Sequence, residues 1–202
     1  MDLIIESVKK LETLLEHSGC YDSGVQLDVD PDAVNCRYEK GACMTAVFWG
    51  KRGVFTTFDP IRACTKISFM FGASLDTPQV RGAACAIINV SAGFFCLART
   101  LRPCTGSPHT PCGAQLAAEL AGKQVFINGT IHSLESLKGI QITTDPSLAE
   151  VILIGGEGLI APGTGNLVET YGKTKRIICV GPSTAGTARL NELEHWCPYG
   201  LG

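Results

Sequence analysis

The stretch "VILIGGEGLIAPGTGNLVET", residues 151–170, decides the fold of the second half of the chain. It begins with four apolar residues and continues into a loop that contains five glycines and one proline. A short run that is apolar on both faces is typical of a strand buried inside a parallel sheet. Glycines after such a strand leave backbone N–H groups accessible at the carboxyl end of the sheet, where ligands bind in open α/β folds. The stretch therefore predicts a parallel sheet with a ligand-binding loop at its edge.

The segments around this stretch repeat the alternation of strand and helix. A helix is predicted over 112–122, and one further helical turn over 145–150. The predicted strands are 124–129, 139–144, 151–156 and 176–181. Because apolar strands alternate with helical segments, we expect a parallel α/β arrangement in this half of the chain.

Two helices are predicted in the first hundred residues. The first covers about 2–17, because apolar residues recur there at helical spacing and form one stripe to be buried. That stripe consists of Ile4, Val8, Leu11 and Leu15. The second helix covers 77–101, with Asp76 as its N-cap.

Three strands are predicted between these helices. Apolar and polar residues alternate over 24–30, which indicates a half-buried strand. Two β-rich runs, 43–50 and 53–58, indicate a hairpin that turns at Lys51 and Arg52. The first half of the chain is therefore expected to be an α+β unit with a small, largely antiparallel sheet.

The segment "RPCTGSPHTPCG", residues 102–113, is the best candidate for a linker, because it has three prolines and no apolar run. It predicts two domains, an α+β domain over 1–102 and a parallel α/β domain over 114–202, joined by 103–113. The overall class is then α/β.

Composition excludes several classes of protein. The 202 residues are 45% hydrophobic and carry a net charge of −2, without the clustered basic excess of a nucleic-acid-binding protein. The most apolar segment, 82–98, contains Asn89 and Ser91 and lies between Arg81 and Arg99, so we expect a buried helix and no membrane span. The first residues do not have the pattern of a signal peptide, and a cytoplasmic location is expected.

Ten cysteines are many for this length. Without a signal peptide we expect reduced thiols and no disulfide framework. Five of them lie inside apolar runs and are expected to be buried as small hydrophobes: Cys43, Cys64, Cys85, Cys96 and Cys179.

Two glycine-rich turns are candidates for a ligand site, one over 155–165 and one over 180–190. Each follows a predicted buried strand and precedes a helix, whose free N-terminal N–H groups favour an anion. The alternative is that the hydroxyl groups in these turns only cap helices. There is no G-x-x-x-x-G-K-[ST] motif, and "GTGNLV" lacks the third glycine of a dinucleotide-binding turn, so support for ATP or NAD is weak.

Three stretches resemble a family named for heavy-metal chelation. "DTPQVRGAACAIINV" (76–90) is similar to its aspartate–proline helix, in which Ala86 and Asn89 match the A-x-x-N turn. "AEVILIGGEGLIAPGTGNLVE" (149–169) is similar to its strand and glycine–threonine loop. "RIICVGPSTAG" (176–186) is similar to its G-P-S-T turn, which is the most specific of the three.

The resemblance implies an enolase N-terminal-like α+β domain followed by a Rossmann-like domain, with a ligand cleft between them and the G-P-S-T turn on its rim. This chain departs from the family pattern where it finishes with "EHWCPYGLG" (194–202), so its second domain is expected to be short at the C-terminus. The candidate ligand-binding residues are Asn89, Gly156, Glu157, Gly158, Gly163, Thr164, Gly181, Pro182, Ser183 and Thr184. Glu157 is the one acidic residue in the first turn, with metal ligand, ribose-hydroxyl acceptor and general base as its alternative roles.

The predicted linker contains possible metal ligands. "CTGSPHTPC" spaces Cys104, His109 and Cys112 so that two thiolates and an imidazole could reach one soft divalent ion, with His195 and Cys197 as further donors. The spacing matches no common zinc module, and the alternative is a proline-rich connector with incidental cysteines. A nucleophilic role for Cys112 is the weaker hypothesis, since it requires an activated thiolate.

These observations favour a protein that binds a small anionic or metal-chelating ligand in an interdomain cleft. Two alternatives stay open: an enzyme that uses a nucleotide-type cofactor in the same cleft, and a structural or partner-binding protein with a vestigial cleft. No catalytic residue is assigned. The cofactor is unknown, with a divalent transition metal as one candidate, and the expected partners are a small molecule or metal, with a homodimer left open.

Overall fold

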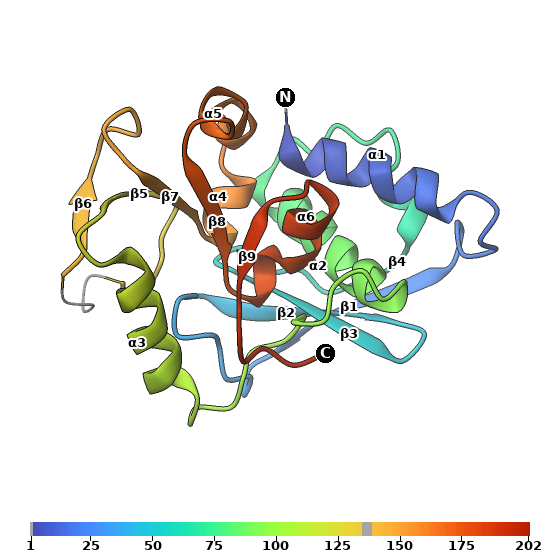
Figure 1. Cartoon of the computed structure of the whole chain (residues 1–202). Helices are drawn as coiled ribbons and strands as arrows, with labels where there is room; N and C mark the ends of the chain where they lie inside the picture. The colour runs from blue at the N-terminus through green and yellow to red at the C-terminus, as the bar shows by residue number, and fades with distance from the viewer. Residues whose placement is uncertain (1, 135–138) are drawn as a thin grey trace.

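The computed structural model describes residues 2–134 and 139–202 and has a mixed α/β fold with two sheets (Figure 1). The first sheet is antiparallel with strand order β3-β2-β1-β4, and the second is parallel with order β6-β5-β7-β8-β9. The predicted α/β class is confirmed. The strands are β1 (Gly24–Asp30), β2 (Ala42–Phe48), β3 (Lys51–Thr57), β4 (Ala63–Lys66), β5 (Gln124–Asn128), β6 (Gln141–Thr143), β7 (Val151–Ile154), β8 (Arg176–Val180) and β9 (Glu194–Trp196).

The helices cover faces of both sheets. In Figure 1, α1 and α2 lie over the antiparallel sheet, and α3 lies beside the parallel sheet. The α-helices are α1 (Leu3–Leu15), α2 (Pro78–Phe94), α3 (His109–Leu120), α4 (Gly156–Ile160), α5 (Thr164–Tyr171) and α6 (Ala185–Leu190), and the 3-10 turns are η1 (Ile67–Met70) and η2 (Pro182–Thr184). No helix in the described part of the chain is long and apolar enough to cross a membrane.

Helix α1 begins after Asp2, whose carboxylate accepts hydrogen bonds from the N–H groups of Ile4 and Ile5 at 3.0 and 3.2 Å. This is the usual way in which an aspartate satisfies the free donors of a first helical turn. All four residues of the predicted apolar stripe are buried. The predicted helix and its buried face are therefore confirmed.

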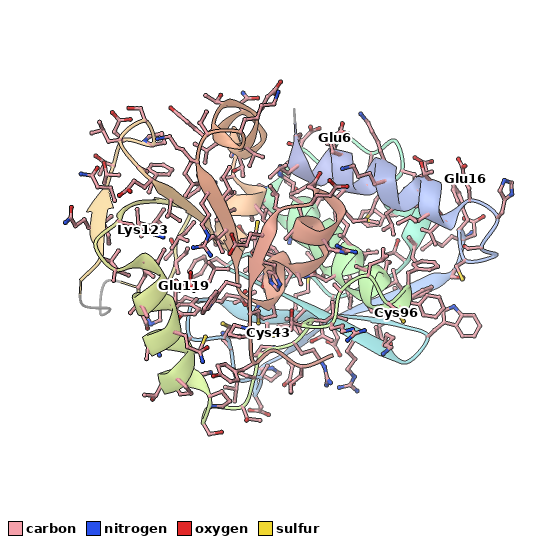
Figure 2. The ribbon with its side chains drawn as sticks, in the orientation of Figure 1. Glu6, Glu16, Cys43, Cys96, Glu119 and Lys123 are labelled. Carbon is pink, nitrogen blue, oxygen red and sulfur yellow. The ribbon has the colours of Figure 1, made fainter. Side chains whose placement is uncertain are left out.

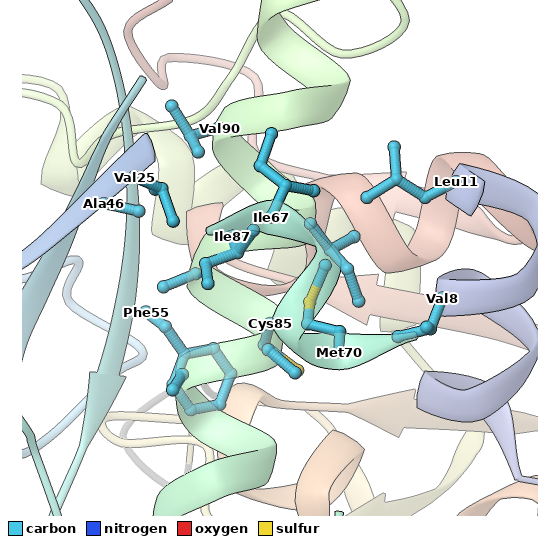
Figure 3. Packing of buried hydrophobic residues seen from close by; sticks show 14 of the residues in the cluster. Val8, Leu11, Val25, Ala46, Phe55, Ile67, Met70, Cys85, Ile87 and Val90 are labelled. Carbon is cyan, nitrogen blue, oxygen red and sulfur yellow. The ribbon is translucent and has the colours of Figure 1, made fainter. Parts of the chain in front are cut away.

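Helix α2 is buried nearly all round and forms the centre of the first core cluster (Figure 3). Two details of its prediction were wrong. Its N-cap is Thr77, whose hydroxyl accepts from the Val80 N–H, and not Asp76. It ends at Phe94 and not at residue 101, because Cys96 takes a left-handed φ of 58° and the Leu97 N–H bonds back to the Ala92 carbonyl.

The hairpin is shifted from its predicted turn. Trp49 and Gly50 form the turn with φ of 47° and 79°, so Lys51 and Arg52 lie in β3 and do not connect the strands. Two residues with positive φ match the right-handed twist of a tight hairpin, which explains why the turn lies there. The pairing of the two strands is as predicted.

The predicted linker is half helical. Helix α3 begins at His109, so the second half of 103–113 forms its first turn, where Pro111 is tolerated because the N–H groups have no intrahelical partner. The predicted helical turn over 145–150 is a hydrogen-bonded turn without helix. At the end of the chain β9 adds a parallel strand next to β8, and Leu201 then pairs with Arg102.

The parallel sheet is covered on both faces, as its continuous apolar strands predict. Alternate residues of β7 and β8 contribute to two separate clusters. One cluster packs against α3 and includes Cys36 and Tyr38 from the loop between β1 and β2. The other packs against α5 and α6 and includes Leu3 of α1. Segments of the first hundred residues thus take part in both cores of the second sheet, and the division at 102/103 stays a prediction.

Three of the five cysteines expected in the core are buried, namely Cys43, Cys85 and Cys179. Cys64 and Cys96 are exposed, contrary to prediction. Cys64 lies on the edge strand β4, and Cys96 follows the end of α2, so neither has a second layer to cover it. Figure 2 labels Cys96 beside the end of α2.

Candidate functional site

The G-P-S-T turn after β8 is buried and already holds an anion, the carboxylate of Glu39. The Ser183 N–H donates to Glu39 Oε1 at 3.0 Å. Gly181 has a φ of 90°, and a Cβ on it would overlap Glu39 Oε1. The turn therefore binds a side chain of this protein with the backbone donors that the sequence suggested for a ligand.

A closed set of hydrogen bonds holds this carboxylate in place. The Thr56 hydroxyl donates to Glu39 Oε2 at 2.9 Å, and the Thr56 N–H donates to Ser183 Oγ at 2.9 Å. Burial raises the pKa of Glu39 to about 7, and this effect outweighs the hydrogen bonds from Ser183 and Thr56, which lower it. A carboxyl group with such a pKa exchanges its proton near neutral pH.

Asn89 connects α2 to the same turn and to β3. Its side-chain amide donates to the carbonyls of Val54, Ser183 and Pro182 at 2.7, 3.0 and 3.3 Å. Its Oδ1 accepts from the Gly186 N–H at 2.7 Å. Asn89 is fully buried, so these bonds satisfy an otherwise costly polar group. These contacts give Asn89 a structural role. Its predicted contact with a ligand stays a prediction.

The remaining residues of the G-P-S-T turn are also engaged within the protein. The Thr184 hydroxyl donates to the Gly181 carbonyl at 2.9 Å. The Pro182 carbonyl is one of the acceptors of Asn89. The four residues of the turn are buried, whereas the resemblance implied that they lie on the rim of a cleft.

The glycine-rich turn after β7 is used mainly to pack α4 against the end of β5. A Cβ on Gly158 would overlap the Asn128 carbonyl, so the close approach requires glycine. Thr164 donates to the carbonyls of Gly158 and Ala161, and its hydroxyl accepts from Asn128 Nδ2 at 2.8 Å. Gly163 caps α5 with a φ of 87°. Because α4 has only five residues, its N-terminus is a weak site for an anion.

A small pocket lies between the turn after β7, the segment after β5, strand β3 and the loop that connects β1 and β2. Its lining residues are Glu39, Lys40, Thr56, Thr130, Gly156 and Glu157. Of these, Gly156 and Glu157 were predicted, and the structure brings them next to Glu39. Glu157 Oε1 is buried, and within the described part of the chain it has no hydrogen-bond partner. We call this the Glu39–Glu157 pocket.

Sequence analysis missed Glu39. It lies between Tyr38 and Lys40 in the loop that connects β1 and β2, and no spacing or motif marks it as functional. A weak signal was the glycine at position 181, whose backbone conformation leaves room for a neighbouring group.

The predicted metal ligands Cys104, His109 and Cys112 lie together and line a second pocket. Cys197 and Cys36 also line this pocket, and the predicted role of Cys197 as a metal ligand stays a prediction. His195 does not line this pocket. Its Nε2 is hydrogen-bonded to the Gly181 carbonyl at 2.9 Å. Burial lowers the pKa of its imidazole. As the side chains stand, no three or more His, Cys, Asp or Glu residues within 2–134 and 139–202 are grouped to hold a metal ion. We call this the cysteine pocket.

Comparison with known proteins gives a likeness of fold to solved structures that include two proteins of the DUF364 family. A protein of unknown function from the DUF364 family of Pyrococcus horikoshii superposes with a TM-score of 0.51 at 15% identity, over 90% of this chain and 79% of that one. A DUF364 protein of unknown function from Desulfitobacterium hafniense gives 0.51 at 14% identity, over 90% and 83%. The likeness is one of fold. No protein-family model matches the sequence, and no curated protein matches it.

Proposed function

We propose that the protein binds a small ligand in the Glu39–Glu157 pocket and that the ligand presents a positively charged or hydrogen-bond-donating group to Glu157. The observation that carries this proposal is the buried Oε1 of Glu157, which lacks a partner in the described part of the chain. An unsatisfied buried acceptor costs free energy, and a ligand that donates to it recovers that cost.

The charge of the pocket supports a ligand that is not a simple anion. Two carboxyl groups, Glu39 and Glu157, line the pocket, and the only ammonium group among its lining residues is that of Lys40. The anion position at the G-P-S-T turn is taken by Glu39. The pocket has a volume of about 10 Å³, which is room for about one water-sized group, so only a small cationic or hydrogen-bond-donating end of a ligand enters it. The anionic or metal-chelating ligand expected from the sequence is thereby narrowed to one whose cationic or metal-bearing end reaches Glu157.

The finer expectations from the resemblance stand here as hypotheses. An enolase N-terminal-like unit followed by a Rossmann-like unit is consistent with an antiparallel sheet followed by a parallel one. A role in heavy-metal chelation is one possible use of the pocket. A nucleotide-type cofactor has less support, since Glu39 occupies the turn where a phosphate group would be expected. An ultraviolet spectrum of the denatured, deproteinised sample tests for such a cofactor.

Thermal unfolding with probes of known charge tests the proposal. The probes are methylammonium, Mn²⁺ and inorganic phosphate, and the variant is Glu157→Gln. Glu16→Gln is the matched control, because Glu16 is an exposed acid at the far end of α1 (Figure 2). We expect a cationic probe to raise the midpoint of unfolding in the wild type and in the control, and to have no effect on Glu157→Gln.

Two outcomes would contradict the proposal. If only phosphate stabilises the protein, the charge assigned to the ligand is wrong. If no probe stabilises it, or if Glu157→Gln responds like the wild type, the pocket is a packing feature, and the hypothesis of a vestigial cleft gains support.

A further inference from the structure

A groove lies on the face of the antiparallel sheet that is opposite α2. A Cβ on Gly53 would overlap the backbone of Val90 in α2, so this position of β3 faces the helix. Because side chains alternate along a strand, Arg52 and Val54 point to the other face. On that face the register places Thr45 of β2 opposite Val54. The groove has a volume of about 310 Å³, which is at the lower end of the range for small-molecule sites.

Strands β1, β2 and β3 form the floor of the groove, and two loops form its walls. Cys43 and Val54 on the floor are buried, so the floor offers apolar contacts. One wall consists of residues 33–34 in the loop between β1 and β2, and the other of residues 102–106 after α2. The Val54 N–H donates to the Leu101 carbonyl at 3.0 Å, which fixes the second wall along the edge strand β3.

Two guanidinium groups line the groove, those of Arg52 and Arg102. Arg52 is exposed, and Arg102 is half-buried. Arg102 Nη2 donates to the Gly202 carbonyl at 2.6 Å, whereas its Nε is buried and has no partner among the described residues. Neither guanidinium forms an ion pair with an Asp or Glu side chain in the described part of the chain. We call this site the Arg52–Arg102 groove.

The groove has one excess positive charge. Among the described residues that line it, two arginines and one aspartate are charged at neutral pH. The aspartate is Asp30 on β1, which β2 separates from β3, and its carboxylate accepts from the Asp32 N–H at 3.0 Å. Asp28, the next residue of β1 on this face, is paired with Arg62 at 2.9 Å. A single excess charge suits one acidic group better than a polyanion such as a nucleic acid.

We propose that the Arg52–Arg102 groove binds a small organic molecule through one carboxylate or phosphate group, which the two arginines bind, while the rest of the molecule packs on Val54 and Cys43. The planar fork of N–H donors on a guanidinium matches the oxygen atoms of both acidic groups. A half-buried positive charge without an acidic side chain beside it is stabilised by such an anion. Binding is reversible and forms no covalent bond.

The site is separate from the one that carries the proposed function. The Arg52–Arg102 groove shares no lining residue with the Glu39–Glu157 pocket, and the charge that it selects in a ligand is the opposite one. The proposal therefore does not rest on the function proposed for Glu157.

The first experiment measures the midpoint of thermal unfolding with butyrate, butyramide and inorganic phosphate at constant ionic strength. Butyramide has the shape of butyrate without its charge. The variants are Arg52→Gln and Arg102→Gln, and the matched control is Lys51→Gln, because Lys51 is the exposed neighbour of Arg52 on β3 and does not line the groove. We expect an anion to raise the midpoint in the wild type and the control, and its apparent affinity to fall at least about tenfold in each arginine variant.

Phosphate also stabilises folded proteins in general, because it is excluded from their surface. The deciding quantity is therefore the difference between Lys51→Gln and Arg52→Gln in their response to each anion. Equal responses of these two variants, or equal stabilisation by butyramide and butyrate, would overturn the proposal. Glu157→Gln is expected to retain the full response to anions, so failure at one site is distinguishable from failure at the other.

Arginine modification provides a second measurement on the native chain, which does not require that Arg102→Gln folds. Phenylglyoxal modifies exposed guanidinium groups, and mass spectrometry of peptides gives the rate at each arginine. We expect the stabilising anion to slow the modification of Arg52 and Arg102 relative to Arg99, an exposed arginine that does not line the groove. The proposal is wrong if the anion protects none of the three, or if it protects Arg99 to the same extent.

Discussion

The two glycine-rich turns after β7 and β8 each follow a buried strand and precede a helix, but their local contacts differ. The turn after β8 binds a carboxylate of the protein itself, Glu39, with the Ser183 N–H. The turn after β7 packs against β5 and leaves Glu157 Oε1 buried without a partner in the described residues. One glycine-rich turn thus binds an acidic side chain of the protein, and the other leaves an acidic side chain without a partner among the described residues. The sequence pattern of glycines after a buried strand does not say which of the two occurs.

The largest expected effect is that of Gly181→Ala. Its backbone is in a region that only glycine adopts readily, and the added Cβ would overlap Glu39. We expect a loss of about 3 kcal/mol or more in the free energy of unfolding, measured in urea. Gly163→Ala, at a positive φ with open space around it, is the control and should cost about 1 kcal/mol. Equal losses would mean that the turn does not depend on Glu39.

The next effect is the pH dependence caused by Glu39. Its pKa is about 7 in the folded protein against an ordinary value of 4.5, so folding takes up a proton between these values. The protonated carboxyl contributes stability that is fully present below about pH 4.5 and is lost as the pH rises through 7. This amounts to about 3 kcal/mol at most.

Glu39→Gln should remove that dependence. Comparing urea unfolding of chelator-treated wild type and Glu39→Gln from pH 5 to pH 8 measures the difference. We expect the stability of the wild type relative to the variant to fall across this range. A constant difference would show that Glu39 ionises normally and that burial does not raise its pKa.

A smaller loss is expected for Ser183→Ala. The substitution leaves the Thr56 N–H without its acceptor at 2.9 Å, and an unsatisfied buried donor costs about 1–3 kcal/mol. Hydrogen exchange of the Thr56 amide should be faster in the variant, which localises the effect to the contact between β3 and the turn. An unchanged exchange rate would indicate that another acceptor replaces the hydroxyl.

The smallest effect on stability is expected for Glu157→Gln, within about 0.5 kcal/mol, because no hydrogen bond of Oε1 is lost. The same substitution abolishes the response to cationic probes if the proposed function is correct. A large loss of stability would instead place Glu157 in the structural network, as Glu39 is. The measured stability of Glu157→Gln therefore shows whether the turn after β7 contacts another part of the protein or is free to bind a ligand.

Local patterns predicted most of the secondary structure. The alternation of 24–30, the helical stripe of α1 and the continuous apolar runs of β7 and β8 each correspond to an observed element. The errors lie at the ends of helices and strands, which the pattern of neighbouring residues in the sequence does not determine. The turn at Trp49 and Gly50, for example, depends on two residues with positive φ, and only one of them is a glycine.

The candidate sites were predicted only in part. Glu157 and Gly156 were found because they follow a strand in a recognisable turn, and Cys104, His109 and Cys112 because they are close together in the sequence. Glu39 and Cys36 were missed because each contacts groups that are distant in the sequence. Glu39 lies 144 residues from Ser183, and Cys36 lies more than sixty residues from Cys104, with which it lines a pocket. A contact between distant segments produces no recognisable spacing of residues in the sequence.

The sequence by itself determined which segments form buried strands and helices, because hydrophobic periodicity and glycine-rich turns act over a few residues. The tertiary structure decided which partner each turn receives. It placed Glu39 on the G-P-S-T turn and Cys36 and Cys197 beside Cys104. These pairings depend on how the loop between β1 and β2 and the C-terminal tail pack against the parallel sheet. Packing between distant segments is determined by the whole core and not by any one stretch of the chain.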